Sequence, residues 1–336
     1  MSRTSREIRL AARPAGAPTP ETFELAEVDV PEPGEGEILV RNRWMSVDPA
    51  MRGRMDDRPS YVAPFQVGAP LEGGAVGEVV ASSSDRHAVG DLVLHGLGWR
   101  DLALLPGKRA ARVDPSLAPE QAFLGVLGMP GLTAYSGLVR VGRIAEGDVV
   151  FVSAAAGAVG SAVGQMARKL GASRVIGSAG GPDKVRHVVE DLGFDACIDY
   201  KGGRIRKQLK ELAPDGVDVY FDNVGGEHLE VAIGALRLNG RIVVCGMISQ
   251  YNATEPPAGP RNLVRLIQTR GTIQGLLVLD HADLRDEFVD RASGWLREGD
   301  LKYEETVVDG LENAPQAMID LLGGRNTGKM LVRIAG

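Results

Sequence analysis

The chain has 336 residues, of which 44% are hydrophobic, 24% charged and 5% aromatic, and its net charge is −6. This length is typical of two domains, and the composition excludes a disordered chain. Without a long basic tract, the chain is not expected to bind nucleic acid. The N-terminus lacks a signal-peptide pattern and no apolar run of about 18 residues occurs, so we expect a soluble cytoplasmic protein that does not enter a membrane.

Residues 1–126 are predicted to form a mostly β domain. Short β-like runs at 37–40, 77–81 and 91–94 are separated by turns rich in proline and glycine.

From about residue 147 the pattern changes to apolar strands that alternate with helix-length segments. Such alternation is typical of a parallel sheet with helices on both faces, which predicts a six-stranded doubly wound α/β domain over 127–298. Residues 299–336 show a strand, helix, strand pattern too short to bury a core alone, so we expect them to return to the first domain. The candidate strands of the α/β domain are 149–153, 174–178, 196–199, 217–222, 241–246 and 272–278.

The strongest local pattern lies between the first of these strands and the helix predicted near Val159. Ala155, Gly157 and Gly160 occupy the three positions of a dinucleotide fingerprint, with alanine in place of the first glycine. Small residues there let the backbone approach a pyrophosphate, whose charge then faces free N–H groups at the helix N-terminus. The alternative is that these residues serve helix–sheet packing alone.

The end of the second strand indicates which cofactor is bound. NAD-binding domains carry an acidic residue there, whereas this chain has Ser178. Lys184, in the segment that follows, could balance the 2′-phosphate of NADP, although it could also be an ordinary solvated lysine. Because no carboxylate would repel the phosphate, the sequence favours NADP over NAD.

Open α/β sheets bind ligands beyond the carboxyl ends of their strands. Tyr200 and Asn223 follow candidate strands, and Cys245 and Gly246 close one, so all four are expected along one edge. Taken singly, each could also be ordinary turn chemistry or, for Cys245, a small buried thiol.

A metal site is not predicted. Cys197 and Cys245 form no disulfide framework or zinc spacing, and the histidines form no recognised ligand pattern. We interpret each histidine as an exposed or loop residue rather than a ligand: His87, His95, His187, His228 and His281.

Without a metal, hydride addition to a carbonyl compound leaves negative charge on an oxygen that some donor must stabilise. Tyr251 is the main candidate, because its proline-rich segment leaves the carboxyl end of the predicted strand 241–246. It could instead be a half-buried aromatic anchor of a long loop. Tyr61, in the first domain, is a second candidate for lining the pocket.

Seven separate stretches resemble the zinc-independent medium-chain reductases, the family of leukotriene B4 12-hydroxydehydrogenase, prostaglandin reductases, curcumin reductase and 2-alkenal reductases. The resemblance implies a Rossmann domain beside a GroES-like mostly β domain. It also implies NADPH-dependent reduction of a carbon–carbon double bond next to a carbonyl group. The stretches are SVDPAMRGRM, PFQVGAPLEGGAVGEV, GMPGLTAYSGL, AAAGAVGSAVGQMARKLGA, FDNVGGE, CGMISQYN and NTGKMLVR.

The resemblance also implies roles for individual residues. It implies that Tyr251 orients and polarises the substrate carbonyl rather than acting as an obligatory acid, and that Lys184 and Tyr200 contact the 2′-phosphate. A homodimer is expected too, joined edge to edge at the sixth strand. The remaining implied cofactor contacts are Gly157, Ala158, Val159 and Gly160 at the pyrophosphate, and Asn223, Cys245, Gly246, Met247, Ile248, Ser249, Leu276, Leu277, Val278 and Asn326.

Two positions depart from the family pattern. Ala50 stands where the family has tyrosine, and Leu276 where an aromatic residue is frequent. Both changes remove bulk from the predicted cleft, which leaves a small hydrophobic enone or enal as the expected substrate without fixing its size. A quinone reductase and a noncatalytic NADPH-binding protein are the alternative functions.

Overall fold

The computed structural model describes residues 3–334. The chain separates into two compact units, one made of Met1–Gly125 with Glu305–Gly336 and the other of Val126–Glu304. Within the described residues, no helix combines the length and the apolar character needed to cross a membrane.

The first unit is built mostly on antiparallel strands. β1 and β2 form a two-stranded ribbon, and a larger sheet has the order β14-β15-β3-β4-β5-β7, with β6 also paired to β3. The strands are β1 Arg3–Leu10, β2 Phe23–Val30, β3 Glu37–Ser46, β4 Ala75–Ser82, β5 Leu92–His95, β6 Leu102–Pro106, β7 Ala111–Arg112, β14 Glu305–Asp309 and β15 Lys329–Arg333.

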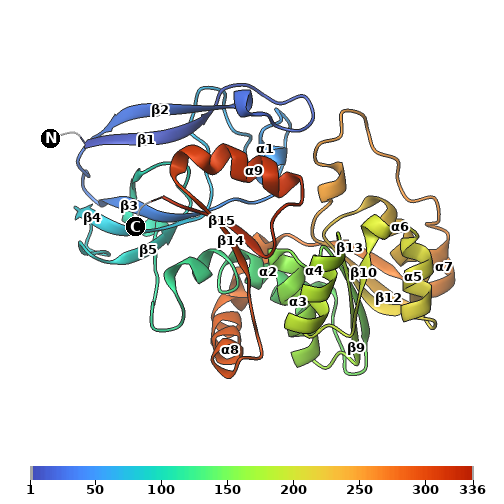
Figure 1. Cartoon of the computed structure of the whole chain (residues 1–336). Helices are drawn as coiled ribbons and strands as arrows, with labels where there is room; N and C mark the ends of the chain where they lie inside the picture. The colour runs from blue at the N-terminus through green and yellow to red at the C-terminus, as the bar shows by residue number, and fades with distance from the viewer. Residues whose placement is uncertain (1–2, 335–336) are drawn as a thin grey trace. The chain divides into compact units, whose positions relative to one another are not determined.

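The C-terminal tail completes this first unit. β15 pairs antiparallel with β3, and β14 pairs parallel with β15. The helix α9 (Ala314–Leu322) lies between the β1–β2 ribbon and the β14–β15 pair (Figure 1). Its buried Met318 shares a core with Leu10, Met45 and Trp99, so residues from both ends of the chain stabilise the unit by burying apolar surface together.

The second unit contains a six-stranded parallel sheet in the order β10-β9-β8-β11-β12-β13. This is the Rossmann order, in which the first and fourth strands lie side by side at the centre. Continuous apolar runs form the central strands because helices cover both faces. The strands are β8 Val149–Ser153, β9 Arg174–Ala179, β10 Ala196–Asp199, β11 Val217–Asp222, β12 Leu236–Val244 and β13 Thr272–Gly275.

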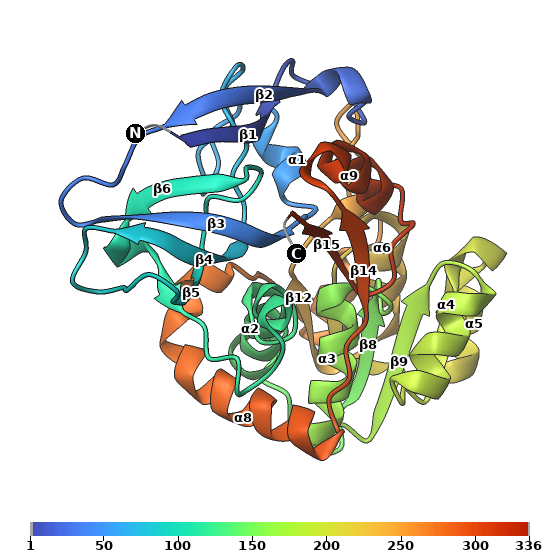
Figure 2. The same ribbon diagram turned by 60° about the vertical axis from the view of Figure 1, so that its left-hand side comes forward.

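Helices pack on both faces of this sheet. α2 contacts α3 and α8, whereas α5 and α7 both contact α6. Figure 2 shows α2 and α3 side by side. The sequence therefore predicted the fold class correctly, as a doubly wound sheet with a separate mostly β unit. The helices are α2 Met129–Ser136, α3 Ala158–Lys169, α4 Pro182–Arg186, α5 Ile205–Leu212, α6 Gly226–Ala235, α7 Arg265–Thr269 and α8 Arg285–Glu298, and the first unit adds α1 Met51–Arg54.

The structure corrects the ends of two predicted strands. β12 stops at Val244, because the N–H groups of Cys245 and Gly246 turn back to the carbonyl oxygen of Asp222. β13 stops at Gly275, so residues 276–278 lie in the segment beyond the strand. The limits of the second unit also differ from the predicted 127–298, since residues 299–304 group with it. The Lys302 N–H donates to the side-chain oxygen of Gln165 in α3 at 2.8 Å, and the Gln165 side-chain amide donates to the Lys302 carbonyl oxygen at 2.9 Å. These bonds hold the segment against the second unit.

Candidate functional site

The centre of the candidate site is the point where β8 and β11 end side by side. Ser153 closes β8, and its hydroxyl oxygen accepts a hydrogen bond from the Asn223 N–H at 2.9 Å. The Asn223 side-chain amide donates to the Ser153 carbonyl oxygen at 2.8 Å. In a sheet with this strand order, helices leave neighbouring strands toward opposite faces here, which opens the crevice where nucleotides bind.

The buried carboxylate of Asp222 fixes the turn after β11. Its Oδ1 accepts hydrogen bonds from the Tyr220 hydroxyl and from the N–H groups of Val224 and Gly225, at 2.7 to 2.9 Å. Its Oδ2 is buried and has no hydrogen-bond partner among the described residues. Burial raises the pKa of Asp222, against the opposing effect of these hydrogen bonds.

The N-terminus of α3 fits the pyrophosphate of a dinucleotide. Gly157 is the N-cap of this helix and no side chain caps it, so the first N–H groups of the helix are not covered by a side-chain acceptor. A Cβ atom at Gly160 would lie 2.2 Å from the carbonyl oxygen of Ala154, so only glycine lets the helix start this close to the turn. The predicted residues Ala158 and Val159 lie between these two glycines, in the first turn of α3.

The segment 245–251 is held against the end of β11. The Cys245 and Gly246 N–H groups donate to the Asp222 carbonyl oxygen at 2.9 and 3.0 Å, and the Ile248 N–H donates to the Asn223 carbonyl oxygen at 3.3 Å. The phenol oxygen of Tyr251 accepts a hydrogen bond from the Met247 N–H at 3.3 Å. The phenol group of Tyr251 therefore lies against the loop that leaves β12.

Two further predicted residues of this edge have clear positions. The Leu276 N–H donates to the Val244 carbonyl oxygen at 2.9 Å, which keeps 276–278 beside the end of β12. Burial raises the pKa of the Cys245 thiol to about 12. That thiol is therefore protonated at neutral pH and is not a nucleophile.

The ends of β9 and β10 carry the second group of predicted residues. Lys184 lies in α4, and Tyr200 begins a short 3-10 turn after β10. Ser178 is buried, and its Oγ lies 2.9 Å from Nε2 of His228 in α6. The Tyr200 ring packs edge-on against the His228 ring, with centroids 5.5 Å apart.

Tyr61 and Asn326 belong to the first unit. The Tyr61 side chain is 65% exposed, and the Asn326 side-chain amide donates to the Gly328 carbonyl oxygen at 2.8 Å. Neither is part of the edge formed by the second unit alone, so the roles given to them stay predictions.

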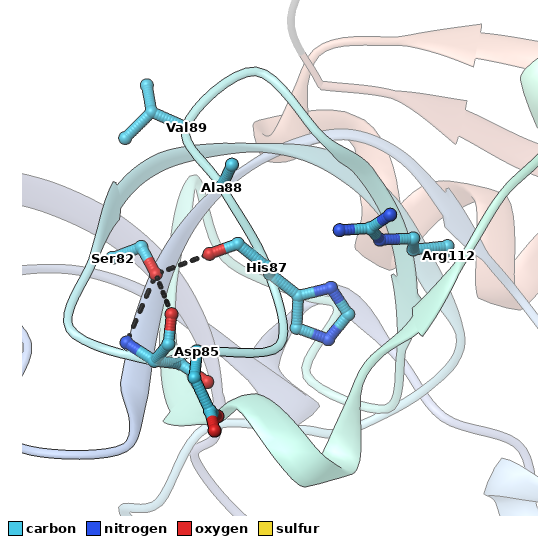
Figure 3. Close-up of a pocket in the computed structure, with 7 residues that line it drawn as sticks. Ser82, Asp85, His87, Ala88, Val89 and Arg112 are labelled. Atoms are coloured by element: carbon cyan, nitrogen blue, oxygen red, sulfur yellow. Dashed lines mark hydrogen bonds between the residues drawn. The ribbon is translucent and has the colours of Figure 1, made fainter.

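A pocket in the first unit contains none of the predicted site residues (Figure 3). Its wall is a turn in which the Ser82 hydroxyl donates to the His87 carbonyl oxygen at 2.6 Å. The His87 ring and the Arg112 side chain face the same hollow. Arg112 already pairs with Asp91 at 3.0 Å, so the polar groups here stabilise the turn. The lining residues are Ser82, Ser84, Asp85, His87, Ala88, Val89 and Arg112.

The expectation that every histidine is an exposed or loop residue was wrong. His95 is buried in β5, with its Nε2 2.9 Å from the Asn42 side-chain oxygen, and His228 is buried in α6. Both hydrogen-bond to polar side chains, which offsets the cost of burying the ring. Among residues 3–334, no three His, Cys, Asp or Glu side chains gather in a group that could hold a metal ion.

Sequence reasoning missed Ser153, Asp222 and His228, which organise the site. Asp222 and Ser153 are the last residues of two central strands, so the rule applied to Asn223 could have found them. His228 carries no such signal. Its partner Ser178 is 50 residues away, and only the packing of α6 on the sheet brings them together.

The fold and this edge define a two-unit dehydrogenase or reductase, and comparisons with known proteins agree. Residues 6–113 match the model of an N-terminal domain of oxidoreductase, and residues 158–294 match a model described as a zinc-binding dehydrogenase. The chain is 44% identical to the NADPH-dependent curcumin reductase of Escherichia coli K12, over 97% of this chain and 96% of that protein. It is 39% identical to the NADP(+)-dependent 2-alkenal reductase of Nicotiana tabacum, over 99% and 98%.

A solved structure matches along the same length. The complex of CurA from Vibrio vulnificus with NADPH superposes with a TM-score of 0.94 at 43% identity, covering 98% of this chain and 99% of that one. The chain belongs to the medium-chain dehydrogenase/reductase family, as the sequence motifs predicted, and is an oxidoreductase enzyme.

The buried His228 predicts a specific acid sensitivity. Burial lowers its pKa from the usual 6.5 to about 4, so the folded protein holds the ring neutral. The resulting stability is complete above the unfolded-state pKa and is lost as the pH falls from about 6.5 to about 4. As the pH falls from 7 to 5, we expect the free energy of unfolding to decrease by about 2 kcal/mol because of this residue.

Urea unfolding at several pH values tests this expectation. His228→Gln should unfold with a shallower dependence on pH between 7 and 5 than the unmodified chain. His281→Gln, at a half-buried histidine of the same unit, is the matched control and should keep the original dependence. Equal slopes for all three proteins would contradict the assignment.

Proposed function

We propose that this enzyme uses NADPH to reduce the carbon–carbon double bond of α,β-unsaturated ketones and aldehydes, without zinc. The dependence on NADP follows from relatives named for it that align along nearly the whole chain. The observation that carries the proposal is the uncapped α3 N-terminus next to glycine-only positions, on the same sheet edge as Lys184 and Tyr200. The scarcity of charged residues in the predicted pocket stretches supports a small hydrophobic substrate.

The proposed cofactor contacts divide along this edge. The first turn of α3 would hold the pyrophosphate through its N–H groups. Lys184 and Tyr200 would hold the 2′-phosphate, because an ammonium and a hydroxyl group both donate hydrogen bonds to it. Asn223 and the segments 245–251 and 276–278 would contact the rest of the cofactor, together with Asn326 from the first unit.

The proposed reaction needs a donor at the substrate oxygen. NADPH, when bound, supplies the hydride that reaches the β-carbon of the substrate. The resulting enolate carries a negative charge that hydrogen-bond donors of the protein must stabilise. Its α-carbon then takes a proton from solvent, which gives the saturated carbonyl compound. Tyr251 is the proposed donor, and its phenol is positioned by the Met247 N–H. Tyr61 is proposed to line the pocket from the first unit.

The absence of zinc is part of this proposal. One matching family model carries the description of a zinc-binding dehydrogenase. A catalytic zinc takes three protein ligands. Among the described residues, however, no three His, Cys, Asp or Glu side chains lie close enough together to hold a metal ion. We therefore assign polarisation of the carbonyl to protein hydrogen bonds.

A panel of acceptors tests the function. NADPH oxidation is followed with trans-2-alkenals, cyclic and linear enones and quinones, with NADH measured beside it. We expect turnover of the alkenals and enones, saturated carbonyl products, and a clear preference for NADPH. Turnover of quinones alone would support the quinone reductase instead, and cofactor binding without turnover would support a noncatalytic protein.

Removal of the Tyr251 hydroxyl tests its proposed role. Tyr251→Phe should lower kcat about 10- to 100-fold and leave NADPH binding nearly unchanged, because one hydrogen bond to the developing charge is lost while the loop keeps its aromatic ring. The conservative control is Tyr303→Phe, at a tyrosine outside the site. Full activity of Tyr251→Phe would show that another group stabilises the enolate.

A homodimer is also proposed, formed at the edge strand β13. This strand pairs only with β12 within the described chain, and an edge strand can pair with a second copy. Nearby apolar side chains are unusually exposed, with Ile267 at 79%, Val264 at 61% and Leu238 at 59%. Burying such surface against a second copy would stabilise the assembly.

Sedimentation measurements test the dimer. Ile267→Asp should raise the dissociation constant at least about tenfold, since a carboxylate would be buried in an apolar contact. Val89→Asp, at a residue 65% exposed in the first unit, should leave the dimer intact. A monomeric unmodified protein at micromolar concentration would reject this proposal.

A further inference from the structure

The loop after β9 packs against the two residues that follow β10. A Cβ atom at Gly180 would lie 2.7 Å from the Tyr200 hydroxyl oxygen and 3.0 Å from Cε of Lys201. The space that a side chain would need at Gly180 is therefore filled by Tyr200 and Lys201. Because Cε bears the ammonium group, the charged end of Lys201 lies beside the glycine loop.

One carboxylate oxygen fixes both loops. Oδ1 of Asp199 accepts a hydrogen bond from the Gly181 N–H at 2.9 Å and another from the Lys201 N–H at 3.0 Å. Gly181 has a φ of 96°, which favours glycine, and begins the turn into α4. The backbone of Lys201 is thus tied to the loop that leads to Lys184.

The charges of the two lysines affect each other. The pKa of Lys184 is lowered first by burial and then by the positive charge of Lys201. No carboxylate pairs with the Lys201 ammonium among the described residues, and the ion-paired lysines are others. An anion bound beside both ammonium groups would relieve their repulsion.

We propose that Lys201 is a specificity-determining residue, which supplies the second positive charge for the 2′-phosphate of NADPH next to Lys184 and Tyr200. This inference rests on the proposed function. A phosphate monoester carries a charge of roughly −1.5 to −2 at neutral pH, so one lysine leaves it incompletely balanced and two match it. NADH lacks this phosphate and gains nothing from the second charge.

Calorimetry on the whole protein tests the role of Lys201. NADPH, NADH and 2′,5′-ADP are titrated into the unmodified chain, Lys201→Gln and Lys201→Arg. Lys201→Gln should weaken NADPH and 2′,5′-ADP binding about tenfold, with NADH changed less than about twofold, because one charge-assisted contact to the phosphate is lost. Lys201→Arg should keep the preference, because arginine keeps the positive charge.

Lys207→Gln is the matched control. Lys207 is an exposed lysine of the neighbouring helix α5, 3.8 Å from Glu211, and its loss should leave all three affinities unchanged. The preference for NADPH should also fall with added salt more steeply in the unmodified chain than in Lys201→Gln.

The outcomes separate two kinds of failure. If the unmodified chain binds NADPH no better than NADH, the proposed function fails. If it prefers NADPH and Lys201→Gln keeps that preference in full, only the role of Lys201 is overturned. Equal weakening of NADH and NADPH in Lys201→Gln would likewise overturn this role, because it would indicate a change in the loop rather than a lost phosphate contact.

Discussion

The buried Asp222 carboxylate is the interaction on which the site of this enzyme depends. It ends the strand β11 at the centre of the sheet, where neighbouring helices leave toward opposite faces. Its side chain accepts hydrogen bonds from the N–H groups that begin the turn into α6. Its backbone carbonyl oxygen accepts hydrogen bonds from the N–H groups of Cys245 and Gly246. One residue therefore sets the positions of two segments at this edge of the sheet. Burying this charge is unfavourable, as its raised pKa shows, and the hydrogen bonds compensate for part of that cost.

The two halves of this sheet edge differ in the chemical groups that they present. Apart from the buried Asp222 carboxylate, the site at β8 and β11 is made of backbone groups, small residues and neutral side chains, which suits a pyrophosphate held by N–H groups. At β9 and β10 it carries two lysines and a tyrosine around a glycine loop. We infer that a dinucleotide is recognised near the centre of the sheet and that NADPH is distinguished from NADH at its edge.

Uncharged buried side chains lie at both parts of this edge. His228 and Ser178 are hydrogen-bonded beneath Tyr200, and the low pKa of the histidine keeps this layer uncharged at neutral pH. A positive ring at that position would add to the repulsion between the lysines. The Cys245 thiol is also protonated, so the chemistry we propose falls to the substrate, the cofactor and the phenol of Tyr251.

The sequence by itself determined the fold class and the family, and it predicted the sheet edge at which the candidate site lies. These are local properties: apolar runs define buried strands, and the glycines of 157–160 define a strand–helix turn that only small residues permit. The tertiary structure alone decided the ends of β12 and β13, the partners of Asp222 and the contact of His228 with Ser178 and Tyr200. It also decided that Lys201 meets Gly180. Such contacts join residues far apart in the chain, and no pattern along the sequence encodes which of them pack together when the strands align.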